Sequence, residues 1–232
     1  MELYHFLVAF FRDGGFFLYP IAAIFLVGVG IIVERFVYLT VETTKNRLLW
    51  SELVPHLGAG NFKGVLALTS KSTAAIATVL NYGIARLANA RRRDDIEKAM
   101  EESLLEIIPR LEKRTHYLSS LANIAMLSGL LGTIIGLIGA FSSIATANPA
   151  EKASLLAASI SVAMNNTASG LFVAITLMLC HMYLEAKTTS AIDSLEIAAV
   201  KFLNSVVERG KQDPESNAPA PAPRGMPQRG LA

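Results

Sequence analysis

The sequence predicts an all-α integral membrane protein with three transmembrane helices, of which the second and third are long and extend into a helical cytoplasmic domain. Hydrophobic residues make up 52% of the 232 residues, and charged residues make up only 17%. The apolar residues are concentrated in runs of roughly 20 residues or more, the length that crosses about 30 Å of hydrocarbon. A soluble core would spread them along the chain instead.

The first apolar run, residues 16–38, is the first predicted transmembrane helix. Pro20 lies near its start, where the missing backbone N–H does little harm. Residues 1–15 do not begin with a basic region, and no small-residue cleavage site follows. We therefore expect them to form a short segment on the outer face rather than a cleaved signal peptide.

Residues 39–117 are polar and predict a helical cytoplasmic domain. Apolar residues recur at helical spacing after Asp94. This helix is expected to continue without a break into the second membrane span, with a kink at Pro109. Another apolar helix is expected over residues 73–90.

Two apolar runs without any Asp, Glu, Lys or Arg follow. The predicted segments are a second transmembrane helix at 118–147, a short outer loop at 148–152, a third transmembrane helix at 153–184, a cytoplasmic helix at 185–210 and a disordered tail at 211–232. Thirty helical residues measure roughly 45 Å, so both long helices are expected to protrude from the bilayer and to pack against the loop helices.

The distribution of basic residues predicts the orientation in the membrane. One base, Arg12, precedes the first span, whereas residues 39–117 and the segment after residue 184 are rich in Lys and Arg. By the positive-inside rule, the N-terminus and the short loop lie outside, and the large loop and the C-terminus lie in the cytoplasm.

Each long span carries one stripe of small and polar residues. The stripe in the second span comprises Gly129, Gly132, Thr133 and Gly136, and the stripe in the third span comprises Asn165, Asn166, Thr167 and Gly170. Small residues at this spacing allow close packing of helices. Two adjacent amides at membrane depth cost more free energy than packing requires, which favours a hydrated or partner-facing surface over packing alone.

Other residues indicate anchoring rather than chemistry. Glu34 and Arg35 end the first span and predict interfacial anchoring with a local ion pair, and Arg91–Arg93 predict contact with anionic headgroups. The four histidines lack metal-ligand spacing, and Cys180 is expected to pack inside its span. No catalytic residue, metal site or cofactor is predicted, so the protein is not expected to be an enzyme. The formal net charge of +2 favours no nucleic-acid partner.

Three motifs resemble the TolQ/ExbB/MotA ion-channel family. Residues 129–136, GLLGTIIG, resemble the family's signature in the second span, and residues 167–175, TASGLFVAI, are similar to its signature in the third. Residues 33–39, VERFVYL, are similar to the Glu-Arg segment that ends its first span. The predicted three-span topology agrees with the ExbB-like and TolQ-like branch.

The resemblance implies a stator subunit that forms a pentameric ring around two single-span partner chains of the ExbD, TolR or MotB type. It also implies that the ring lies in the lipid bilayer of a bacterial inner membrane, with the N-terminus in the periplasm. The partner would supply a membrane Asp, and Thr133 and Thr167 would be the hydroxyls that face it. The glycines of the stripes would pack helices in the ring. The transported ion is expected to be H⁺, with Na⁺ as the alternative because Asn165 and Asn166 add carbonyl oxygens.

Two positions depart from the pattern of the family. Val162 stands where ExbB-like members usually have Glu, and Thr176 stands where they usually have Pro. These departures leave open which machine the protein would drive: envelope transport, gliding or swimming. A passive oligomeric scaffold, with stripes that serve packing only, is the alternative function.

Overall fold

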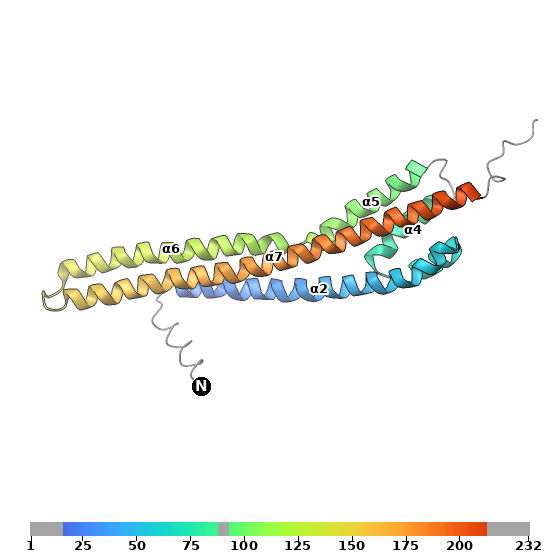
Figure 1. Cartoon of the computed structure of the whole chain (residues 1–232). Coiled ribbons are helices and arrows are strands. Elements are labelled where there is room, and N and C mark those ends of the chain that lie inside the picture. The colour runs from blue at the N-terminus through green and yellow to red at the C-terminus, as the bar shows by residue number, and fades with distance from the viewer. Residues whose placement is uncertain (1–15, 88–92, 213–232) are drawn as a thin grey trace, which may run out of the picture.

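The structure is a computed structural model that describes residues 16–87 and 93–212. Throughout these residues the regular structure is α-helical, which confirms the predicted all-α class. The predictions for residues 1–15, for Arg91 and Arg92, and for the tail beyond residue 212 lie outside the described residues. The helices form an elongated bundle (Figure 1).

Three helical stretches of the described residues are long and apolar enough to cross a membrane, as predicted. The helices are α2 (Leu18–Gly58), α3 (Phe62–Thr69), α4 (Ala75–Leu87), α5 (Arg93–Glu112), α6 (Thr115–Thr146) and α7 (Lys152–Gln212). The three candidate spans lie in α2, in the stretch that contains α5 and α6, and in α7.

α6 and α7 form an antiparallel hairpin, and α2 lies alongside α7 and runs in the same direction (Figure 1). The hairpin extends well beyond the start of α2. Phe17, which precedes α2, lies beside Gly132 in the middle of α6. α2 therefore covers only the part of the hairpin that is nearer to α5.

Both α2 and α7 run far past the ends of the predicted spans. The boundaries predicted at residues 38 and 184 interrupt neither helix, because no glycine or proline lies near either position. As a result, two helices connect the apolar part of the molecule directly to the part that contains α3, α4 and α5. We call this second part the helical domain; it also includes residues 39–58 of α2 and 185–212 of α7.

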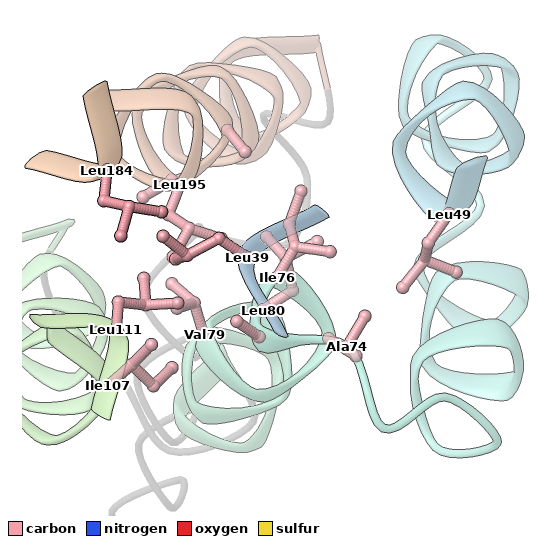
Figure 2. Close-up of a cluster of buried hydrophobic side chains, with 14 of the residues drawn as sticks. Leu39, Leu49, Ala74, Ile76, Val79, Leu80, Ile107, Leu111, Leu184 and Leu195 are labelled. Carbon is pink, nitrogen blue, oxygen red and sulfur yellow. The ribbon is translucent and has the colours of Figure 1, made fainter. Parts of the chain in front are cut away.

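The core of the helical domain is formed by large aliphatic side chains from four helices (Figure 2). Leu39, Val79, Leu111 and Leu195 come from α2, α4, α5 and α7 and are almost inaccessible to solvent. Burying one such side chain contributes about 1.5–3 kcal/mol. Phe202 of α7 is also fully buried and packs edge-on against a second aromatic ring of α3.

α4 is held at its N-terminus by two side chains of α2. The Ala75 N–H donates to Glu42 Oε1 at 2.7 Å, and the Ile76 N–H donates to Asn46 Oδ1 at 3.1 Å. These bonds satisfy backbone donors that a helix start leaves without partners. The helix expected over residues 73–90 is present over Ala75–Leu87, where it is fixed to α2, and residues 88–90 lie outside the described residues.

The prediction of an unbroken helix from Asp94 into the second span is wrong. α5 ends at Glu112 and α6 begins at Thr115, and between them Arg114 has a left-handed backbone with φ of 66°. Pro109 lies inside α5 and does not end it. A left-handed backbone conformation costs about 1–2 kcal/mol of free energy at a residue other than glycine. The surrounding contacts must therefore hold Arg114 in this conformation.

Candidate functional site

Around the stripe glycines, the backbones of α6 and α7 come close together. A Cβ added at Gly170 would lie 2.7 Å from the Ala125 carbonyl oxygen and 2.9 Å from Gly129 Cα. A Cβ added at Gly136 would lie 3.1 Å from Ala163 Cβ. We call the contact formed by Gly129, Gly132, Gly136, Ala163 and Gly170 the glycine seam.

Polar side chains of α7 lie in the glycine seam. The Thr167 hydroxyl donates to the Gly129 carbonyl oxygen at 3.1 Å and so joins the two helices. Asn166 is only 3% exposed, and its Cβ would lie 3.0 Å from a Cβ added at Gly132. Its Oδ1 atom is buried and has no hydrogen-bond partner among the described residues. A buried amide oxygen of this kind favours an additional donor at the seam.

Thr133 and Asn165 lie at the edge of the seam and are partly exposed. The Thr133 hydroxyl donates to the Leu130 carbonyl oxygen of its own helix at 2.6 Å. Both candidate threonines thus donate their hydroxyl hydrogens to backbone carbonyl oxygens. Each hydroxyl oxygen still has lone pairs that can accept a hydrogen bond or coordinate a cation. The edge of the seam can receive an ion or a donor without bearing a charge itself.

The stripe glycines were expected to pack helices in a ring. In one chain, Gly129, Gly132 and Gly170 are buried between α6 and α7 of the same chain. Their contribution to contacts between copies stays a prediction. In α7, Thr176 donates to the Phe172 carbonyl oxygen at 2.8 Å, and the helix continues without interruption through this position, where family members usually have proline.

Near the start of α6, Arg35 of α2 forms hydrogen bonds with the C-terminal end of α5. Its side chain is only 3% exposed and donates to the carbonyl oxygens of Leu111 and Arg110. The guanidinium also lies over the Tyr38 ring, 4.8 Å from its centroid. A cation is favourable at this place because the carbonyl end of a helix has a partial negative charge.

Glu34 forms an ion pair with Arg114, 80 positions away in the sequence. Both Glu34 carboxylate oxygens lie 2.5 Å from Arg114 Nη1, and the two side chains are 48% and 45% exposed. The local ion pair expected between Glu34 and Arg35 is therefore wrong, because each of the two contacts the α5–α6 junction instead. Sequence reasoning missed Arg114, since no local pattern marks its partner.

The titratable side chains of the described residues do not gather into a metal site. Among residues 16–87 and 93–212, no group of three or more His, Cys, Asp or Glu side chains lies close enough together to hold a metal ion. Val162 is partly exposed on α7, near the seam residue Ala163. The glycine seam and its polar edge are thus the candidate functional site.

A sequence model of the MotA/TolQ/ExbB proton channel family matches residues 71–197. This stretch includes the whole of α6 and both polar stripes. The chain belongs to this family. Family membership and the three apolar helices together make it a multi-pass membrane protein of channel type.

Similar proteins agree with membership in the MotA/TolQ/ExbB family. A protein of Methanothermobacter thermautotrophicus described as a biopolymer transport ExbB homolog is 26% identical over 81% of this chain. The match spans 66% of the length of that relative. An ExbB-like protein of Synechocystis is 29% identical over 72% of this chain and 79% of its own length.

A solved structure shares the fold. The structure of Campylobacter jejuni MotAB matches 94% of this chain and 89% of its own chain, with a TM-score of 0.61 and 17% sequence identity. At this identity the match shows that the helices are arranged alike. It supports the fold of the MotA/TolQ/ExbB family for nearly the whole chain.

Proposed function

We propose that the protein is an ion-conducting stator subunit that uses the proton motive force to do mechanical work through a single-span partner. Its membership in a proton channel family supports this function. The decisive observation is the group of neutral polar side chains at the glycine seam: Thr167 and Asn166 lie in the seam and Thr133 lies at its edge, all in apolar helices. The work would serve envelope transport or motility.

The proposed pathway is divided between two chains. Residues 118–147 and 153–184 contain no carboxylate, so this chain offers only neutral acceptors at membrane depth. A conducting site for protons needs a titratable group, which we assign to an Asp of an ExbD-, TolR- or MotB-like partner. A charged carboxylate is costly in hydrocarbon, and the hydroxyls of Thr133 and Thr167 would solvate it while an ion crosses.

The proposed assembly is a pentameric ring around the partner in the inner membrane. Large apolar side chains cover the outer faces of the hairpin in a single chain; among them are Ile134, Ile138 and Phe141. These faces can contact lipid or further copies of the chain. The excess of Lys and Arg in residues 39–117 supports a periplasmic N-terminus and a cytoplasmic C-terminus.

Replacing the two hydroxyls tests the pathway. We expect Thr133→Val with Thr167→Val to abolish partner-dependent proton flux and force output while the protein still accumulates in the membrane. Thr176→Val is the matched control, because Thr176 donates to its own helix as Thr133 does but lies away from the seam. Normal flux in the double variant would disprove the role of these hydroxyls.

The ion is tested by removing sodium at a fixed membrane potential. We expect activity to persist without Na⁺, because H⁺ is the proposed ion. Activity that needs Na⁺, and that Asn165→Leu or Asn166→Leu removes, would instead assign the amide oxygens to sodium coordination.

A passive scaffold is favoured by one observation: the seam glycines pack two helices of the same chain tightly. Purification of the tagged protein from its native membrane separates the two functions. A single-span chain with a membrane Asp, held at substoichiometric amount inside a ring by cryo-EM, supports the stator. A ring without such a chain supports the scaffold.

A further inference from the structure

Three helices meet where α5 ends and α6 begins. Arg35 of α2 is buried and donates to the last carbonyls of α5. Next to it, Glu34 binds Arg114, the residue with left-handed backbone between the two helices. We call Glu34, Arg35 and Arg114 the junction clamp.

The junction clamp contacts the chain before and at the break that precedes α6. One side chain of α2 holds the helix before the break, and its neighbour holds the residue at the break. The first residue of α6, Thr115, is only 4% exposed. Two anchors at a break restrict the direction of the helix that follows.

The rotation of α6 at its start is transmitted to Thr133. Thr133 follows Thr115 by about five helical turns, or roughly 27 Å along the axis, so both lie on the same face. The helix between them is unbroken. A rotation of 20° about the axis would therefore displace the Thr133 hydroxyl by about 1 Å.

The glycine seam and the junction clamp hold α6 at two places along its axis. At the seam, Gly170 leaves no room for a side chain beside Gly129, and the Thr167 hydroxyl bonds to the Gly129 carbonyl oxygen. Glycines themselves have no side chains that interlock two helices. The junction clamp is a second anchor, at the start of the same helix.

We propose that Glu34, Arg35 and Arg114 are positioning residues of the ion pathway, which hold α6 in the rotation that presents Thr133 at the polar edge of the seam. This inference rests on the proposed stator function. It assigns to the end of the first span a role in conduction that is separate from anchoring at the membrane surface.

Exchange of the charges tests the clamp. Three variants are compared: Glu34→Arg, Arg114→Glu and the double variant with both changes. Each is purified with its native partner complex and reconstituted into liposomes, where proton flux is followed with a pH-sensitive dye under an imposed potential. Amide hydrogen exchange of residues 111–118 is measured on the same samples.

Two further variants separate the clamp from other effects. Glu97→Gln is the matched control, because Glu97 forms an ion pair with Arg93 at nearly the same exposure, 47% and 48%, but away from the junction. Arg114→Gly keeps a residue that favours φ of 66° and removes only the ion pair. This variant shows whether proton flux depends on the ion pair or on the backbone conformation of residue 114.

If the clamp positions the pathway, each single charge variant and Arg114→Gly lose about tenfold or more in flux, because a displacement near 1 Å can cost up to 100-fold in a positioned site. Melting temperatures stay near that of Glu97→Gln, amides 111–118 exchange faster, and the double variant regains both flux and protection. Flux in the single variants equal to that of Glu97→Gln overturns the proposal. So does a loss of folding that the double variant does not restore.

The proposed function fails in a different way. If the wild-type complex shows no partner-dependent flux, the stator function is wrong. The hydrogen exchange then still decides about the clamp: protection restored in the double variant confirms that the ion pair holds the junction, and unchanged protection in the single variants overturns it.

Discussion

The two halves of α7 pack by opposite means. At the glycine seam, up to Gly170, α7 contacts α6 through backbone atoms, and Gly170 leaves no room for a side chain next to Gly129. Beyond the seam, the large side chains of Leu177 and Leu184 are already buried. In the helical domain, the same helix packs through large side chains such as Leu195 and Phe202. The change from glycines to large apolar residues occurs within one uninterrupted helix.

The solvent explains this difference. In water, burying a large apolar side chain is favourable in itself. In hydrocarbon this driving force between helices is absent, so close van der Waals contact and a few hydrogen bonds must hold them together. Small residues and the bond from Thr167 to Gly129 supply both in the glycine seam. The following predictions test the contrast, from the largest expected effect to the smallest.

Phe202→Ala should cause the largest loss of stability. Phe202 is fully buried and contacts Phe62 with ring centroids 6.0 Å apart. Truncation of such a residue costs about 3–5 kcal/mol, which thermal unfolding in detergent measures. A loss below 1 kcal/mol would show that side-chain packing does not dominate the helical domain.

Gly170→Ala should destabilise the hairpin by about 1–3 kcal/mol, the usual cost of overpacking. The added Cβ would meet backbone atoms of Ala125 and Gly129, which cannot rotate away. Gly139→Ala is the control, because a Cβ there would meet nothing within 4 Å. Equal melting temperatures for the two variants would contradict backbone contact in the seam.

Thr167→Val should cost only about 0.6 kcal/mol, the average for interhelical hydrogen bonds in membranes. The shape of the side chain is kept and the bond to the Gly129 carbonyl is lost. Proton flux, in contrast, should fall strongly if the proposed function holds. A parallel loss of stability and flux would instead assign Thr167 to packing.

Gly83→Ala should have almost no effect on stability, within about 0.5 kcal/mol. The added Cβ would lie 2.8 Å from Met100 Sδ and 3.1 Å from Phe202 Cε1. The flexible Met100 side chain can move, and the Phe202 ring needs to shift by only a few tenths of an ångström. Replacing a helical glycine also gains about 0.5–1 kcal/mol, which offsets the crowding. Chemical denaturation of this variant next to Gly170→Ala compares a side-chain neighbour with a backbone neighbour. A loss as large as that of Gly170→Ala would show that Met100 cannot yield.

The sequence predicted the spans and marked the stripe residues for a simple reason: both depend on local composition. Runs without charge fix where a chain can cross a bilayer, and the glycines of the stripes revealed a close helix contact. It did not reveal the break at Arg114, because left-handed residues are usually glycine and Arg gives no such signal. Glu42 and Asn46 likewise cap α4 from a distant helix, which no local pattern shows.

What the sequence determined by itself was the all-α class, the three spans and the neutral polar residues at membrane depth. These follow from hydropathy and from side-chain chemistry, which are local properties of each segment. Only the tertiary structure decided that Thr167 bonds to Gly129, that Asn166 is enclosed beside Gly132, and that Glu34 pairs with Arg114. Such contacts join residues far apart in the chain, and their geometry exists only when the helices are packed together.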